Sequence, residues 1–344
     1  MTIRPRPAVD QIDPYRAGRR SAQSHGSLAS NESPYAASPR IIQAIGAAAH
    51  QLNRYPDALA ADLRAQLAAM HDVDEDQILV GNGSDELIYL LAWAYLSDGG
   101  RALCADPAYR MDEITTHLAG ATLLKVPLRN WAHDLERMSE VETDLCYVVN
   151  PHNPTGTART GAEISEFAKS AKAKLVVVDE AYIDFVDDPD ATTAIPLARE
   201  GRVAVLRTLS KAYGLAGLRV GYIVASAEII KVLQKIRAPF SVGTLAQAGA
   251  LAALSDVTHR QRIREHAIQT RQIVHDLFSS AGYSVVPSQA NFVLVVAPED
   301  ELLERLNDHG ISARPGSTLG LPGTVRVSVP SEDGLALLRS ALGT

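Results

Sequence analysis

The sequence is poor in several features that mark particular classes of protein. Its 344 residues include only two cysteines, Cys104 and Cys146, both in apolar runs typical of strands. We therefore expect buried free thiols and no disulfide framework. No apolar stretch approaches the roughly 18 uninterrupted residues of a membrane-spanning helix. The opening segment MTIRPRPAVDQIDPYRAGRR carries charges but no apolar core, so we expect no secretory signal and a cytoplasmic location.

Positive charge is also scarce. The chain has 33 Lys and Arg against 40 Asp and Glu, a net charge of −7, whereas a nucleic-acid partner requires a basic face. We find no internal repeat, no low-complexity tract and no basic helix-turn-helix extension, which argues against a DNA-binding regulator. No metal site is expected. The chain is long enough for a large core and two lobes. Its composition, 46% hydrophobic and 21% charged residues, is ordinary for a globular enzyme.

Short apolar runs alternate with helical patterns in the middle of the chain. Runs of this kind between helices predict an α/β fold, with a mostly parallel seven-stranded sheet between helices. After Gly282, shorter strand and helix patterns predict a small α+β C-terminal lobe. The seven runs are ILVGNG, RALCAD, TLLKVPL, LCYVVN, KLVVVDE, VAVLRTLS and GYIVAS.

Three parts of the chain differ in pattern. Residues 1–35 are expected to form an irregular arm, disordered or laid across a partner subunit. Residues 36–240 are expected to form a large domain, in which the pattern predicts helices at 38–52 and 56–71. Residues 241–344 are expected to contain long helices and the small C-terminal domain.

Lys211, in VLRTLSKAYGLAGLRVGY, is the most informative residue. It lies where a buried strand passes into a loop, and a lysine partly removed from water has a more nucleophilic amine. Thr208, Ser210 and Arg219 add hydroxyl donors and a fixed positive charge suited to a phosphate. A lysine for an aldehyde beside donors for a phosphate indicates pyridoxal 5′-phosphate. An ordinary surface lysine is the alternative.

Polar residues at other strand ends could serve the same ligand, because ligands bind at the carboxyl ends of parallel strands. Asp179 could pair with a pyridinium nitrogen, although it could also cap a helix or form a structural ion pair. Tyr182 and Asn153 could bind a ring oxygen, and Tyr109 could stack on the ring, but a plain turn and a core tyrosine are the alternatives.

The turn GNGSDE is a further candidate. The backbone N–H groups of Ser84 and Asp85 would suit a phosphate at a helix start, although a simple cap is equally compatible. Each feature is weak alone. Their succession at consecutive strand ends favours one shared ligand.

These strings resemble the fold-type I pyridoxal phosphate-dependent aminotransferases, and within them the histidinol-phosphate aminotransferase subgroup. The resemblance covers nearly the whole chain. It rests on LASNESPY, NRYPD, GNGSDELI, NPHNPTG, VVVDEAYIDF, LRTLSKAYGLAGLRVGY, APFSVGTLAQ, SQANFV and VRVSV.

The resemblance implies a role for each matching residue. Lys211 is the Schiff-base lysine and proton carrier, Asp179 binds the ring nitrogen, and Tyr182 the ring oxygen. Tyr55 would reach the phosphate bound by the other subunit of a homodimer. The remaining cofactor contacts implied are Ser84, Asp85, Tyr109, Asn153, Thr208, Ser210 and Arg219. The substrate contacts implied are Tyr15, Asn31, Asn153, Arg314 and Arg326, with Tyr15 acting across the dimer.

The implied reaction is amino transfer from L-histidinol phosphate to 2-oxoglutarate in histidine biosynthesis. Two arginines directed at one anion suit a phosphate better than a single carboxylate, although Arg314, beside a Pro-Gly turn, could instead be a surface residue. Departures at His152, at Arg110 and in PYAASP leave open an aromatic or other amino-acid aminotransferase. A decarboxylase or lyase on the same fold would share every cofactor residue.

Overall fold

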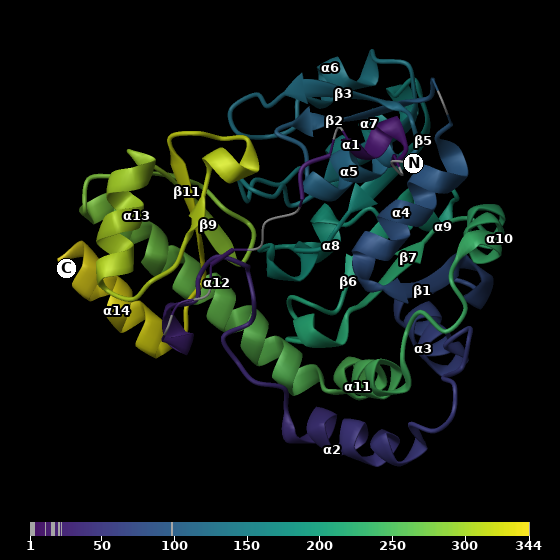
Figure 1. Ribbon diagram of the computed structural model, residues 1–344, viewed down its shortest axis with the longest axis horizontal. Coiled ribbons are helices and arrows are strands. Elements are labelled where there is room, and N and C mark those ends of the chain that lie inside the picture. Colours follow the sequence, from purple (N-terminus) through teal and green to yellow (C-terminus); the bar gives the residue numbers. More distant parts are fainter. Residues whose placement is uncertain are drawn as a thin grey trace.

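The computed structural model describes residues 4–10, 12–14, 18–19, 21, 23–97 and 99–343. Within these residues the larger sheet has seven strands in the order β1-β7-β6-β5-β4-β2-β3 (Figure 1). Strand β7 is antiparallel to both of its neighbours, and the remaining pairs are parallel. The predicted α/β fold is confirmed. The bounds are β1 Ile78–Asn82, β2 Arg101–Asp106, β3 Thr122–Pro127, β4 Thr143–Val149, β5 Ala173–Asp179, β6 Ala204–Thr208 and β7 Val220–Val224.

Helices cover both faces of this sheet, which is why most of its strand positions are buried and apolar, whereas the edge strand β3 contains Lys125 and is largely exposed or half-buried. Side chains alternate between the faces of a strand, so Val176 and Val178 face one helix layer while Val177 faces the other. The first layer contains α2 (Pro39–Ala48), α3 (Ala61–His71), α7 (Gly161–Ser170) and α11 (Thr244–Ser255); the second contains α4 (Gly83–Tyr95), α5 (Arg110–Leu118) and α10 (Ala227–Ile236).

A second, antiparallel sheet follows in the order β10-β11-β9-β8. The long helix α12 (Val257–Ser280) runs from beside α11 to this sheet and packs on it with two later helices (Figure 1). The predicted α+β lobe is therefore present, but its two-residue strand β10 was not expected. The bounds are β8 Ser284–Val286, β9 Phe292–Val296, β10 Arg314–Pro315, β11 Thr324–Ser328, α13 Glu299–Asp308 and α14 Glu332–Leu342.

Short helices occupy several connections. In the N-terminal arm, expected to be irregular, α1 contacts α5 of the same chain, and Arg6 donates to the Leu118 carbonyl oxygen at 3.2 Å. Among the described residues, no helix combines the length and the apolar character needed to cross a membrane. The bounds are α1 Pro7–Asp10, α6 Leu135–Ser139, α8 Pro189–Thr192 and α9 Ile195–Arg199.

The helix predicted at 56–71 begins later, at Ala61. The Asp57 carboxylate accepts hydrogen bonds from the N–H groups of Leu59 (2.9 Å) and Ala61 (2.6 Å). An Asp side chain that bonds backbone N–H groups in this way holds a turn in place of a helix. Residues 56–60 consequently form a loop.

Candidate active site

The carboxyl ends of the parallel strands carry most of the predicted site residues. Asp179 is the last residue of β5, and Lys211 follows β6 by three positions. Asn153 follows β4, and Tyr109 lies between β2 and α5. Because neighbouring parallel strands end at one edge of a sheet, these side chains converge.

Lys211 is half-buried where the sheet edge meets the N-terminal segment. Its ammonium group donates a hydrogen bond to the Ser30 carbonyl oxygen at 3.2 Å and lies 5.7 Å from the centre of the Tyr182 ring. Among the described residues this carbonyl is the one hydrogen-bond acceptor of the amine, which leaves the amine able to turn toward a ligand. Ser30 was not predicted from the sequence, since it contributes only a backbone oxygen.

Asp179 is a buried carboxyl whose Oδ1 accepts a hydrogen bond from the Ala181 N–H at 2.9 Å. Burial, assisted by the charges of Asp85 and Glu180, raises the pKa of Asp179 to about 7, against the opposing effects of the Ala181 N–H and Lys211. Burial of this carboxylate is costly unless a cation joins it. A protonated ring nitrogen would supply that cation.

A buried polar network joins the two sheets around Tyr182. The Asn31 side-chain amide donates to the Tyr182 hydroxyl at 3.0 Å, and Ser328 Oγ donates to Asn31 Oδ1 at 2.9 Å. Asn31 has a φ of 54°, a left-handed conformation that Asn tolerates better than most residues. Ser328 lies in the predicted string VRVSV, but no spacing rule pointed to this serine.

Hydroxyl groups and a guanidinium gather beside the start of α4. Thr208 Oγ1 donates to Ser210 Oγ at 2.9 Å, and Arg219 Nη1 donates to the same Ser210 Oγ at 3.3 Å. Arg219 also forms an ion pair with Asp85 at 3.2 Å. The backbone around Ser84 opens the helix, so its N–H groups add to the positive potential there.

Glycines keep this cluster open. A Cβ added at Gly83, whose φ is +75°, would lie 2.6 Å from Arg219 Nη2. A Cβ added at Gly221 would lie 2.4 Å from the backbone nitrogen of Ser84. The close approach of backbone, hydroxyls and guanidinium forms a cradle whose donors fit a phosphate. The donor set, with Asp179 and Lys211, thus fits pyridoxal phosphate.

Tyr109 is half-buried next to Asp85. Its hydroxyl donates to Asp85 Oδ1 at 3.0 Å. Burial and the charges of Asp85 and Asp179 raise the pKa of Tyr109 well above its usual value, so the phenol remains a neutral donor. This tether fixes the ring near the cradle.

Two buried arginines lie on neighbouring strands of the second sheet. Arg314 in β10 is the cross-strand partner of Arg326 in β11. Arg326 donates to Asn153 Oδ1 at 2.5 Å and to the Ala29 carbonyl oxygen at 2.8 Å, and its guanidinium lies 5.2 Å from the centre of the Phe292 ring. Arg326 therefore brings fixed positive charge from the second sheet to the Asn153 loop, and Arg314 lies across from it in the ladder.

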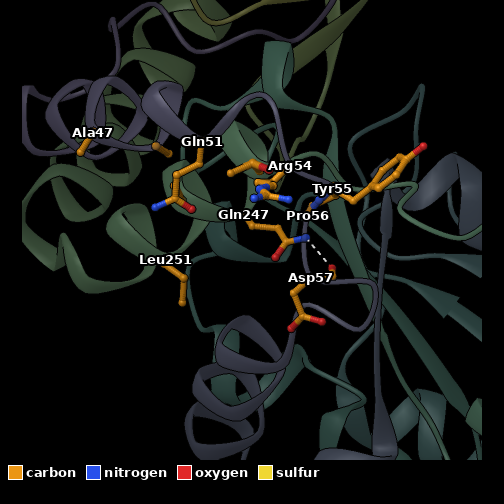
Figure 2. Close-up of a pocket in the computed structure, with 11 residues that line it drawn as sticks. Ala47, Gln51, Arg54, Tyr55, Pro56, Asp57, Gln247 and Leu251 are labelled. Atoms are coloured by element: carbon orange, nitrogen blue, oxygen red, sulfur yellow. Dashed lines mark hydrogen bonds between the residues drawn. The ribbon is translucent and has the colours of Figure 1, made fainter.

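Of the predicted residues that the structure describes, Tyr55 does not join this cluster. Tyr15 lies outside the described residues. Tyr55 is 82% exposed and stacks on Phe240 with ring centres 4.7 Å apart. It borders a hollow of about 400 Å³ between α2 and α11, where Gln51, Gln247 and Leu251 are among the lining residues (Figure 2).

The family model described as "Aminotransferase class I and II" matches residues 26–342. The chain is 39% identical to histidinol-phosphate aminotransferase of Brevibacillus brevis, over 89% of this chain and 86% of that protein. It is also 39% identical to the aromatic amino acid aminotransferase of Thermobifida fusca, over 95% and 93%.

Among solved structures, histidinol-phosphate aminotransferase from Sinorhizobium meliloti, in complex with pyridoxal 5′-phosphate, superposes with a TM-score of 0.89. That likeness extends over 99% of this chain and 97% of the other, at 26% sequence identity.

Proposed function

Because the chain belongs to the aminotransferase class I and II family, we propose that it transfers the amino group of L-histidinol phosphate to 2-oxoglutarate, with pyridoxal 5′-phosphate as cofactor. This activity places the protein in histidine biosynthesis. The enzyme is a cytoplasmic homodimer in this proposal, and the outward-facing Tyr55 is the feature that supports the dimer.

The cofactor residues have separate tasks in this proposal. Asp179 holds a negative charge against the ring nitrogen, while Tyr182 and Asn153 direct polar atoms toward the ring oxygen. Tyr109 covers the ring. Ser84, Asp85, Thr208, Ser210 and Arg219 surround the phosphate. When bound, the cofactor withdraws electrons from the substrate carbon that loses its proton.

Lys211 has the chemical task. Its amine, near the Tyr182 ring, accepts the proton that leaves the α-carbon of the amine substrate and later returns a proton to complete the transfer. The Ser30 carbonyl, 3.2 Å from Nζ, orients the amine between these events. Asn31 holds the Tyr182 hydroxyl in place by donating a hydrogen bond to it.

The cross-strand pair Arg314 and Arg326 carries the substrate assignment. Both guanidinium groups are buried and permanently charged. A dianionic phosphate can engage two such groups, whereas a carboxylate is satisfied by one. The pair therefore favours a phosphorylated amine. Asn31 and Tyr15 complete the proposed substrate contacts.

Aromatic amino-acid transfer is the second candidate, because the Thermobifida fusca relative is equally similar in sequence. The two are separated by mixing the loaded enzyme with L-histidinol phosphate, L-phenylalanine, L-tyrosine and L-glutamate in separate absorbance assays. We expect the visible band of the bound cofactor to disappear with L-histidinol phosphate and L-glutamate. Disappearance with L-phenylalanine but not with L-histidinol phosphate would reject the primary substrate. Product analysis showing an intact amine and released carbon dioxide would indicate a decarboxylase instead.

A further inference from the structure

Phe240 adopts a backbone conformation that large side chains rarely take. Its φ is 62°, in the left-handed region, and it follows Pro239. A turn with a positive φ after proline ordinarily has glycine at this position. Its side chain is 41% exposed, so core packing does not account for the conformation. Strained residues of this kind persist where the surroundings hold them and often serve a site.

The surroundings of Phe240 are a pair of loops fastened to each other. Arg237 donates to the carbonyl oxygens of Val80 (2.8 Å) and Ala58. Gln247 Nε2 donates to the carbonyl oxygens of Asp57 and Val242, both at 2.9 Å. The loops that contain Tyr55 and Phe240 are thereby held in one fixed relation.

The same loops are fastened to the phosphate cradle of their own chain. Asn82, immediately before α4, donates through its side-chain amide to the Ser241 carbonyl oxygen at 3.1 Å. Ser241 Oγ donates to Glu86 Oε2 at 3.1 Å. The position of Phe240 is therefore set relative to the turn that opens α4.

Phe240 in turn fixes the direction of Tyr55. The two rings are stacked, with an interplanar angle of 19°. Tyr55 is 82% exposed, and its side chain extends away from the hollow lined by Gln51, Gln247 and Leu251 (Figure 2). Within a single chain, the strained backbone of Phe240 holds the Tyr55 ring in a position where it is exposed to water. This indicates that the Tyr55 ring contacts another molecule.

We propose that Phe240 is a positioning residue: its ring orients Tyr55 so that the phenol hydroxyl donates a hydrogen bond to the cofactor phosphate held by a second copy of this chain. The inference rests on the proposed function, namely the homodimer and the reach of Tyr55. It adds a residue that acts without touching the cofactor, and it gives a reason for the left-handed phenylalanine.

The test is the affinity of the cofactor-free enzyme for pyridoxal phosphate, measured by absorbance titration for Tyr55→Phe, Phe240→Ala and the double variant. Loss of a hydrogen bond to a charged group predicts a roughly tenfold or greater rise in Kd for Tyr55→Phe. Phe240→Ala should raise Kd by a comparable factor. In the Tyr55→Phe background, Phe240→Ala should change Kd by less than about twofold, because the hydroxyl it positions is gone.

A matched control is Trp93→Ala. Trp93 is 57% exposed and packs edge-on against Tyr89 on α4, so this change also removes an exposed ring from an aromatic pair. Its Kd should equal that of the unaltered enzyme. If Tyr55→Phe weakens binding and Phe240→Ala does not, the positioning role is wrong while the proposed function stands. If neither changes Kd, the reach of Tyr55 in the proposed function fails.

A second variant separates positioning from general stabilisation. Phe240→Gly relieves the left-handed strain, so the cofactor-free protein should keep or raise its unfolding midpoint while its Kd rises as for Phe240→Ala. A lowered midpoint with an unchanged Kd would show that Phe240 serves the fold and not the site.

Discussion

Asp179 ends β5 with its carboxyl buried and with a pKa raised to about 7 by burial. In the unfolded chain the same carboxyl ionises at the usual value of 3.8. The folded, cofactor-free protein therefore binds a proton that the unfolded chain releases between these two values. Asp179 consequently destabilises the cofactor-free fold increasingly as the pH rises from about 4 to 7.

Asp179→Asn should remove this cost. The amide is never charged, so the free energy of unfolding of the cofactor-free variant should exceed that of the unaltered protein, and the excess should grow by about 3 kcal/mol between about pH 4.5 and about pH 8. Its affinity for pyridoxal phosphate should fall, because the ring nitrogen loses its counter-charge. Chemical denaturation at the two pH values measures the first effect. An excess that stays constant with pH would contradict the account.

The loop after β4 is supported by two buried histidines. His133 Nε2 donates to the Val149 carbonyl oxygen at 2.9 Å, and the His133 ring meets the His152 ring edge-on at 4.9 Å. His152 Nδ1 bonds Thr155 Oγ1 at 2.9 Å. Burial lowers the pKa of His133 to about 4, and burial and His133 lower the pKa of His152 well below its usual value. Both rings are therefore neutral at pH 7.

Acid should therefore weaken this element. In the unfolded chain His133 becomes protonated as the pH falls below its usual pKa of 6.5. In the folded chain it stays neutral until the pH falls to about 4. Stability is fully present above 6.5 and is lost as the pH falls from 6.5 toward 4, by about 3 kcal/mol for His133 alone. His133→Gln should flatten the fall in unfolding free energy between about pH 7 and about pH 4.5. Parallel profiles for the two proteins would exclude this role.

The elements that the sequence predicted best were those defined by burial alone. The runs that became β1 to β7 are rich in apolar residues because helices cover both faces of the sheet, and that pattern is visible without tertiary information. The helix predicted from residue 56 failed for a local reason. The Asp57 carboxylate accepts hydrogen bonds from the N–H groups of Leu59 and Ala61. Helix propensity does not predict a turn of this kind.

Contacts between distant segments were beyond sequence reasoning. Strand β10 is two residues long, and its pairing of Arg314 with Arg326 depends on the position of β11. The backbone oxygen of Ser30 and the hydroxyl of Ser328 enter the site by tertiary packing. The positions of Lys211, Asp179 and Arg219 were predictable, because each lies near a strand end or in a glycine-rich turn, whereas their roles stay predictions.

In the proposed homodimer, each active site is completed by residues of both subunits. Tyr55 points outward, whereas the lysine and the phosphate cradle lie at the edge of the large sheet. Two copies related by a two-fold axis could each lend Tyr55 to the other.

Mixed dimers test this sharing. Lys211→Ala and Tyr55→Ala subunits are each expected to be inactive when the cofactor is too dilute to saturate the Tyr55 variant. After random subunit exchange, half of the dimers are mixed and each has one site with both native residues, so about a quarter of all sites should regain activity. If Tyr55 served its own subunit, no mixed dimer would contain an intact site. Absence of recovery would thus place Tyr55 within one chain.

The assignment of the whole active site depends on Lys211 as the attachment point of the cofactor. We would reduce the loaded enzyme with borohydride, digest it and map the cofactor mass by mass spectrometry. We expect a single modified peptide, with the added mass on Lys211, and no modified peptide from Lys211→Ala prepared in the same way. Cofactor mass on a different lysine, or an unmodified Lys211 in fully loaded enzyme, would contradict this assignment.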